Sequence, residues 1–134
     1  MKNEDITKLV NDSISLLQEL IQHPSPSGRE NVTGTIIEQF LHNCGITAKR
    51  QNNNIWAYNK HQQPDRPAIL LNSHHDTVKP NNTWSIDPYQ PKSESGRLYG
   101  LGSNDAGGAL VAQLAAFRYF YARKNLPYNL IIFN

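Results

Sequence analysis

Two short apolar runs on either side of a helical segment constrain the fold of this chain most strongly. The run at 68–71 has no polar alternation, which is typical of a central strand covered on both faces. The proline-rich segment 79–96 is expected to be a long loop, followed by a short edge strand at 98–99. Helical spacing at 107–123 and a second apolar run at 128–133 complete the pattern. Strand, helix and strand in this order predict a right-handed parallel crossover in an open α/β sheet.

The first half of the chain predicts two helices and a hairpin. An amphipathic helix is expected from about Asp5 until Pro24 ends it. A second helix is expected to end at Gly45, where the left-handed C-terminal conformation favours glycine. Its buried face is expected to contain Val32, Ile36, Phe40 and Leu41. Strands at 46–50 and 55–58, separated by turn-forming asparagines, predict a hairpin.

Composition and charge argue against several functional classes. The chain has 134 residues, of which 38% are hydrophobic and 18% charged, values that suit one soluble globular domain. Thirteen basic and eleven acidic residues are spread along the chain, and this pattern predicts neither a nucleic-acid groove nor a membrane surface. The longest apolar stretches, about six residues, are short of the roughly twenty that span a bilayer. One cysteine, Cys44, and no signal-peptide pattern lead us to expect a cytoplasmic protein.

Two polar clusters follow the elements of the crossover. His74, His75 and Asp76 come directly after the first strand, and Asp105 precedes the third helix. Residues two apart on extended backbone point the same way, so we expect His74 and Asp76 to share a side while His75 faces elsewhere. Imidazole and carboxylate groups are ligands that zinc takes. The sequence therefore predicts a metal site with ligands His74 and Asp105, in which Asp76 assists the imidazole.

Each of these residues also has a simpler interpretation. His74 could be a hydrogen-bonded loop residue, Asp76 a turn former and Asp105 a helix N-cap. The glycine pair before Asp105 could cradle a phosphate, but the charge of Asp105 in place of a third glycine would repel an anion. His75 and Asp76 could imitate the paired residues of helical phosphohydrolases, although they follow a strand. An iron-oxygenase triad would need a later histidine, and none follows His75.

Three motifs occur in a definite order along the chain. They are the segment 24–30, the stretch 70–78 and the stretch 96–105, with Trp84 and Asp87-Pro88 between the last two. In this order they resemble the M20 family of metallopeptidases and amidohydrolases. The resemblance covers most of the chain. It implies a three-layer αβα, zinc-peptidase-like catalytic domain with a mixed, largely parallel sheet.

The resemblance also implies roles for the site residues. His74 would be a metal ligand, Asp76 the carboxylate that orients the site, and Asp105 the ligand that bridges two zinc ions, with Co²⁺ or Mn²⁺ as alternatives. A cis peptide bond would follow the bridging aspartate, at Asp105-Ala106. The general-base glutamate and the remaining ligands of the family would lie outside this chain.

Domain organisation and substrate follow from the same resemblance. Residues 1–134 would be the N-terminal part of the catalytic domain, without its C-terminal part and without the lid domain that pairs subunits into a homodimer. The form 100–107 is most similar to acetylornithine deacetylases of arginine biosynthesis, which act on small N-acyl amino acids. The alternatives are an M20 dipeptidase or carboxypeptidase, a succinyl-diaminopimelate desuccinylase, or a noncatalytic interaction module. We expect the 134 residues alone to be inactive.

Overall fold

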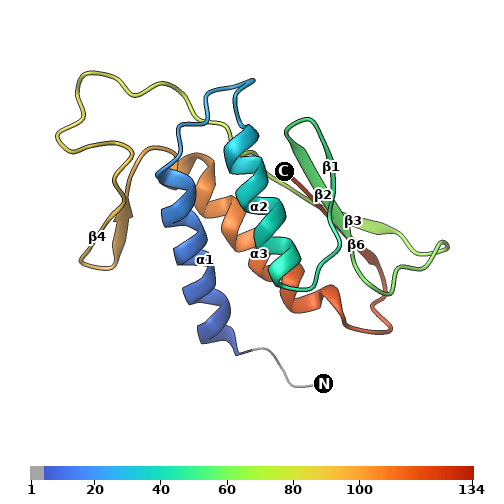
Figure 1. The fold of residues 1–134 in the computed structure, drawn as a ribbon. Helices are drawn as coiled ribbons and strands as arrows, with labels where there is room; N and C mark the ends of the chain where they lie inside the picture. Colours follow the sequence, from blue (N-terminus) through green and yellow to red (C-terminus); the bar gives the residue numbers. More distant parts are fainter. Residues whose placement is uncertain (1–4) are drawn as a thin grey trace.

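The chain forms a four-stranded mixed sheet with a helical layer on one of its faces, and a separate two-stranded hairpin (Figure 1). A computed structural model describes residues 5–134. The helices are α1 (Ile6–Ile21), α2 (Asn31–Asn43) and α3 (Gly108–Tyr121), and a π-helical turn, η1 (Ser103–Gly107), leads directly into α3. The strands are β1 (Lys49–Gln51), β2 (Asn54–Tyr58), β3 (Ala68–Asn72), β4 (Lys92–Glu94), β5 (Arg97–Tyr99) and β6 (Asn129–Phe133).

The predicted parallel crossover is present. The sheet has the strand order β1-β2-β6-β3. Strand β6 pairs in parallel with β3, so that Leu70 lies opposite Ile131, and α3 connects the two strands. Strand β6 also pairs with β2, and β2 with β1, both antiparallel. The sheet is mixed as predicted, but in residues 5–134 antiparallel pairings outnumber parallel ones because the β1–β2 hairpin joins the sheet beside β6.

The prediction that the run at 68–71 is a central strand covered on both faces is wrong for the described residues. Strand β3 lies at the edge of the sheet, and β6 occupies the inner position that we assigned to it. The side chains of Ile69 and Leu70 are 42% and 58% exposed. An uninterrupted apolar run shows that a strand has apolar side chains on both faces, but it does not show which other elements cover those faces.

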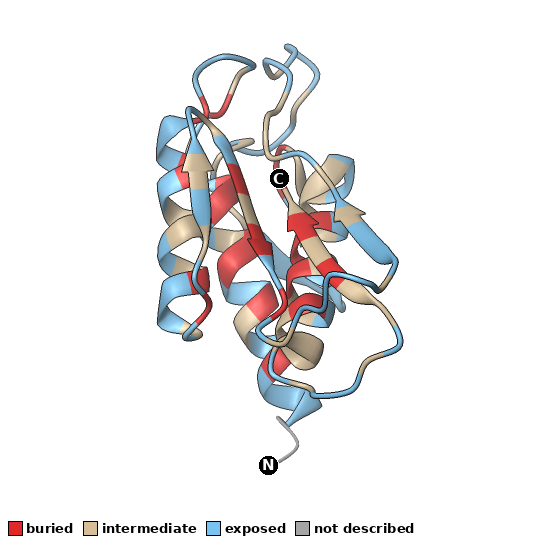
Figure 2. Cartoon of the chain, turned by 90° about the vertical axis from the view of Figure 1, so that its right-hand side faces the viewer, coloured by how far each residue is buried: buried red, intermediate tan, exposed pale blue. Residues whose placement is uncertain are grey.

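Alternation along β2 and β6 separates the two faces of the sheet (Figure 2). Ile55 and Ile132 point into the core, where they meet Leu110, Leu114 and Phe117 of α3. The rings of Trp56 and Phe133 stack on the opposite face, with centroids 6.1 Å apart, and remain partly exposed. Residues 5–134 therefore supply one of the two helical layers expected for a three-layer domain.

Helix α1 follows its prediction closely. Asp5 caps its N-terminus, where one carboxylate oxygen accepts a hydrogen bond from the amide of Thr7 at 2.9 Å. The buried residues Leu9, Leu16 and Leu20 keep the expected helical spacing. The first helix is therefore readable from periodicity and capping alone.

Helix α2 has the predicted end but a different buried face. Gly45 takes the positive φ of 71° expected after a helix. Val32 was expected in the core, yet it is 49% exposed, and Ile36 and Phe40 are only partly buried. Gly34 is buried and faces β2. A Cβ at this position would lie 3.3 Å from the Ile55 side chain, so a residue without a side chain lets α2 approach β2 closely. The inward face consists of Thr33, Gly34, Ile37 and Leu41.

The segments around the site differ in detail from their predictions. Strand β1 starts at Lys49, three residues later than expected, and β2 agrees with the predicted hairpin. The end of the predicted loop 79–96 forms β4, which pairs with β5 as a separate hairpin.

Within residues 5–134, no helix is long and apolar enough to cross a membrane.

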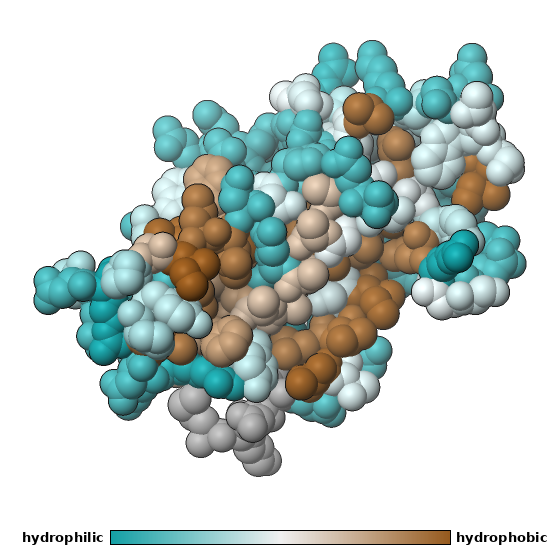
Figure 3. Space-filling view, turned by 180° about the vertical axis from the view of Figure 1, so that it is seen from behind, coloured by the Kyte–Doolittle hydropathy of each residue, from teal (hydrophilic) through white to brown (hydrophobic). Residues whose placement is uncertain are grey.

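An apolar groove of about 560 Å³ runs between α1 and α3. Seen from behind, apolar side chains gather over these helices (Figure 3). Val10 and Ile14 on α1 are 50% and 44% exposed, and Ala115, Tyr119 and Phe120 line the groove from α3.

Candidate metal centre

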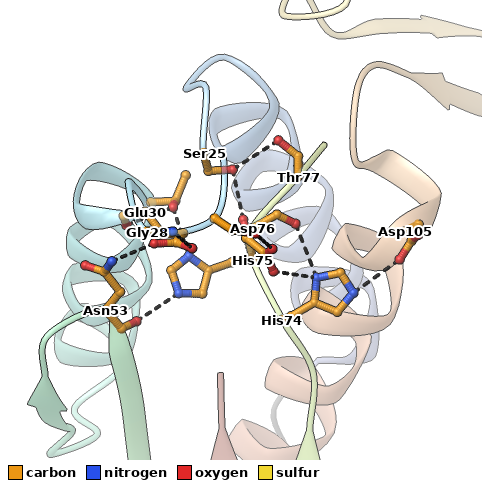
Figure 4. A network of polar contacts seen from close by, with 11 residues as sticks. Ser25, Gly28, Glu30, Asn53, His74, His75, Asp76, Thr77 and Asp105 are labelled. Carbon is orange, nitrogen blue, oxygen red and sulfur yellow. Dashed lines mark hydrogen bonds and ion pairs between the residues drawn. The ribbon is translucent and has the colours of Figure 1, made fainter. Parts of the chain in front are cut away.

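The imidazole of His74 and the carboxylate of Asp105 meet at one end of the sheet (Figure 4). His74 follows the carboxyl end of β3, and Asp105 lies in η1, just before α3. His74 Nε2 is 3.2 Å from Asp105 Oδ1. Both side chains remain open to solvent, with 51% and 89% of their surfaces exposed. The structure therefore brings together two groups that are 31 positions apart in the sequence.

Asp76 contacts the other nitrogen of the same imidazole. His74 Nδ1 lies 3.0 Å from Asp76 Oδ1 and 3.2 Å from the backbone oxygen of Asp76. The second carboxylate oxygen, Oδ2, accepts a hydrogen bond from the Ser27 hydroxyl. This hydrogen bond, helped by the charge of His74 and opposed by partial burial, lowers the pKa of the Asp76 carboxyl below its ordinary value. Asp76 is thus an ionised acceptor at neutral pH that can hold a proton on Nδ1 and leave the lone pair on Nε2.

His75 points away from this pair, as the alternation along an extended segment predicts. Its Nδ1 lies 2.8 Å from the hydroxyl of Thr33, and its Nε2 lies 2.9 Å from the backbone oxygen of Asn53. Both ring nitrogens are therefore occupied by protein contacts. Of the two neighbouring histidines, His74 has the nitrogen that is available to a ligand.

The loop between α1 and α2 holds the segment that carries both histidines. Ser25 donates a hydrogen bond from its hydroxyl to the backbone oxygen of His75 at 2.9 Å. The amide of Thr77 donates to the backbone oxygen of Ser25 at 2.8 Å, and Pro26 forms a parallel bridge with Thr77. No contacts of Ser25 or Ser27 were predicted from the sequence. The signal was nevertheless present, because both belong to the segment 24–30 that marked the family resemblance.

Glycines allow the second half of the site to approach the first. Gly102 has a φ of 78°, and a Cβ there would lie 2.6 Å from the methyl group of Thr77. A Cβ on Gly107 would lie 2.5 Å from Leu17 on α1 and 2.6 Å from the backbone oxygen of Gly102. Gly107 therefore lets the start of α3 approach α1 closely. The predicted cis peptide bond at Asp105-Ala106 is present.

The donor set fits part of a metal site. Zinc binds imidazole nitrogen and carboxylate oxygen at about 2.0–2.2 Å, which places two ligands of one tetrahedral ion about 3.3 Å apart. The separation of His74 Nε2 and Asp105 Oδ1, 3.2 Å, agrees with that spacing, although it also suits a hydrogen bond. In the part of the chain that the structure describes, no group of three or more His, Cys, Asp or Glu could hold a metal ion. The residues present therefore fit as two ligands of an ion whose other ligands come from elsewhere.

Two of the simpler interpretations lose support. The Asp105 side chain caps neither η1 nor α3, because neither helix start has a side-chain capping bond. The segment that carries His75 and Asp76 is not helical, which removes the basis for a helical phosphohydrolase site.

A cleft of about 400 Å³ opens over the pair. His74, Asp76 and Asp105 contribute to its wall, together with the ring of Trp84 and the half-buried Ser103. Among the described residues that line it, none is a lysine or an arginine. The cleft offers carboxylates, hydroxyl and amide groups and an aromatic surface to a ligand, and its described wall has no cationic side chain to pair with an anionic group.

Comparison with known proteins agrees with these features. Residues 70–133, which include His74, Asp76 and Asp105, match the sequence model of Peptidase family M20/M25/M40. The chain belongs to the M20 family. Sequence relatives of this M20 chain include a probable carboxypeptidase of Paracoccidioides brasiliensis, 32% identical over 97% of this chain and 33% of the relative. A succinyl-diaminopimelate desuccinylase of Halorhodospira halophila is 33% identical over 83% of this chain and 30% of the relative.

A solved structure extends the comparison to the fold. The YXEP protein of Bacillus subtilis, described as a dinuclear metal-binding peptidase of the M20 family, superimposes with a TM-score of 0.68. The match is 16% identical and covers 95% of this chain and 35% of that protein. The mixed α/β architecture is therefore that of M20 peptidases. The M20 chain spans about a third of the length of the curated relatives it matches.

Proposed function

We propose that this M20 chain is part of a metal-dependent hydrolase of amide bonds and contributes two metal ligands and one orienting carboxylate. The observation that carries the proposal is the 3.2 Å approach of His74 Nε2 to Asp105 Oδ1, with Asp76 on the opposite nitrogen of the same ring. A carboxylate–histidine pair of this kind is the usual support of a metal-bound imidazole. The family membership and the curated names of the relatives point to the same reaction class.

Each of the three residues would have a separate task. Asp76 would hold the proton on His74 Nδ1, so that Nε2 faces Asp105 with its lone pair free. Asp105 would direct its exposed carboxylate at the same position and, by the family resemblance, bridge two ions. The bound metal would supply the Lewis acid that activates water and polarises the scissile carbonyl.

Zinc is the metal that we propose, because one imidazole with carboxylates is a donor set that zinc accepts. A dinuclear site in the B. subtilis relative supports two ions rather than one. Cobalt and manganese remain alternatives that the same ligands would accept. The general-base glutamate and the other ligands would come from parts of the polypeptide outside these residues.

For the substrate we propose an N-acyl amino acid or a peptide with a free carboxylate. The relatives' names, carboxypeptidase and succinyl-diaminopimelate desuccinylase, favour these alternatives over the acetylornithine deacetylase of arginine biosynthesis that the sequence first suggested. The cleft agrees only in part, because its described wall carries acceptors and no cation for that carboxylate. A lid domain, which would also pair two subunits, is the proposed source of the missing cation.

Metal analysis of the full-length protein that contains this chain tests the proposal. We expect about two zinc ions per subunit after reconstitution, and hydrolysis of a panel of succinyl- and acetyl-amino acids and dipeptides that stops after chelation. Return of activity with Zn²⁺ or Co²⁺ would support the assignment. A protein that retains its activity without metal, or binds none, would refute it.

A further inference from the structure

A group of partly buried polar contacts surrounds the His75 ring, beside the candidate metal site. We call its four members, Glu30, Thr33, Asn53 and His75, the polar brace. Glu30, Asn53 and His75 are labelled in Figure 4. The backbone oxygen of Asn53 can only accept, so the ring of His75 donates to it from Nε2. His75 Nδ1 is then an acceptor and faces the Thr33 hydroxyl at 2.8 Å, while the backbone oxygen of Glu30 lies 3.0 Å from the same hydroxyl as a second acceptor for its single proton.

Glu30 fixes the turn that provides the Asn53 oxygen. Its carboxylate accepts a hydrogen bond from the side-chain amide of Asn53 at 2.6 Å and one from the backbone amide of Gly28 at 2.7 Å. The residue is only 9% exposed. The turn between β1 and β2 is thereby tied to the loop before α2, and both are tied to His75.

Glu30 and Thr33 are buried and Asn53 and His75 are partly buried, and polar groups placed in this way argue for a role beyond packing. A carboxylate, an imidazole and a hydroxyl lose hydration when they are buried, so a network of them adds less stability than apolar side chains of similar size. What such a network can supply is one defined orientation. Here that orientation concerns the backbone of residues 74–77, because His75 lies between His74 and Asp76 and its own oxygen is held by Ser25.

We propose that Thr33, Glu30 and His75 are positioning residues for the metal ligand His74. By holding the His75 ring at both nitrogens, the polar brace fixes the direction in which the neighbouring imidazole presents Nε2. The inference rests on the proposed function, since positioning has a measurable effect only if His74 binds a metal. It adds residues from α2 and from the β1–β2 turn to a site otherwise built from β3 and η1.

Metal titration of the full-length protein tests the inference. Zn²⁺ affinity is measured by competition with a chelator, and the visible absorption of the Co²⁺ form reports the ligand geometry. We expect His75→Ala and Thr33→Val to weaken zinc binding by about tenfold, the lower end of the effect of groups that support a ligand, and to alter the cobalt spectrum. Thr33→Ser, which keeps the hydroxyl, should stay within about twofold of the wild type.

Controls separate positioning from folding. His42→Ala removes an exposed histidine from α2 and should leave affinity and spectrum unchanged. Glu30→Gln preserves size but places an amide donor against one of the two donors that Glu30 accepts, from Gly28 and Asn53. It should therefore also weaken zinc binding, and it replaces His75→Ala as the test if that variant does not fold. The positioning role would be refuted if folded His75→Ala had the zinc affinity and cobalt spectrum of the wild type, or if Thr33→Ser lost as much affinity as Thr33→Val. Either result would leave the proposed function standing. Failure of the wild-type protein to bind metal would instead refute the proposed function on which the inference depends.

Discussion

Neighbouring histidines in this chain have opposite environments. His74 is half exposed, and each of its nitrogens faces a carboxylate. His75 is enclosed by Thr33 and Asn53 and uses both nitrogens in contacts with neutral groups. A metal ion could bind a nitrogen of His75 only after one of these contacts breaks, whereas His74 Nε2 faces an open cleft.

His74→Ala should therefore remove metal binding at this site. We expect zinc affinity and amide hydrolysis of the full-length protein to fall by more than about a hundredfold, because a direct ligand contributes more than the residues that support it. Equilibrium dialysis followed by metal analysis measures the first quantity. The exposed His42 provides the matched control, and a His74→Ala protein with unchanged zinc content would show that the wrong histidine was chosen.

Helices α1 and α3 are joined by a charged contact at their exposed edge. Asp12 accepts a hydrogen bond from Arg118 at 2.7 Å and pairs with Lys8 one turn earlier. The hydrogen bond from Lys8, followed by that from Arg118, lowers the pKa of the Asp12 carboxyl below its ordinary value. A depressed folded-state pKa adds stability above the unfolded value of about 3.9, and this contribution is lost as the pH falls through the folded value.

Asp12→Asn should thus destabilise the protein at pH 7 and have little effect in strong acid. We expect about 1 kcal/mol at neutral pH, since solvent screens this partly exposed group. Urea unfolding of wild type and variant between pH 7 and pH 2 measures the difference. Asp65→Asn, at an exposed position, should show no such pH dependence. A constant difference down to pH 2 would contradict the pKa argument.

Gly107 lets the start of α3 pack closely against α1. Gly107→Ala should destabilise the protein by about 2 kcal/mol, because the added methyl group meets Leu17 and a backbone oxygen that cannot move freely. Gly96→Ala separates this steric effect from backbone conformation, since its φ is 75° but its surroundings are open. Thermal unfolding compares the two variants. A smaller loss for Gly107→Ala than for Gly96→Ala would refute the steric explanation.

The molecule as a whole presents more apolar surface than a closed core requires. One sheet face carries Trp56 and Phe133, the edge strand β3 exposes Leu70, and the groove between α1 and α3 exposes Val10 and Ile14. Exposed apolar surface of this extent is typical of faces that are covered in a larger assembly. Together with the one-third share of the relatives' length, it supports the proposal that catalysis needs further parts of the protein.

The 134 residues alone should not hydrolyse amides. At the site, the described residues offer one imidazole and one carboxylate as ligands, His74 and Asp105, and no group of three ligands among the described residues could hold a metal ion. We expect no amine release above background from succinyl- or acetyl-amino acids, with the full-length protein as the positive control. Turnover by the purified 134-residue chain that is lost in His74→Ala would contradict this expectation.

Local patterns in the sequence determined much of this structure. Periodicity and Pro24 predicted α1, the strand–helix–strand order predicted the crossover, and alternation predicted that His74 and Asp76 share a side. Each of these depends on residues close together in the chain, where backbone geometry fixes the direction of side chains. The convergence of His74 and Asp105 was also expected. His74 follows β3 and Asp105 precedes α3, and in a strand–helix–strand crossover these two positions lie at the same end of the sheet.

The sequence did not reveal which surfaces are covered or which distant groups support the site, because both depend on contacts between segments far apart in the chain. The apolar run of β3 is the same in the centre or at the edge of a sheet, so its place at the edge depended on the pairing of β6 with β2. The face of α2 that is buried depends on the close approach to β2 that Gly34 allows. The polar brace joins Glu30, Asn53 and His75 across segments without a shared periodicity, because hydrogen bonds between distant residues depend on how the chain folds and leave no pattern along it.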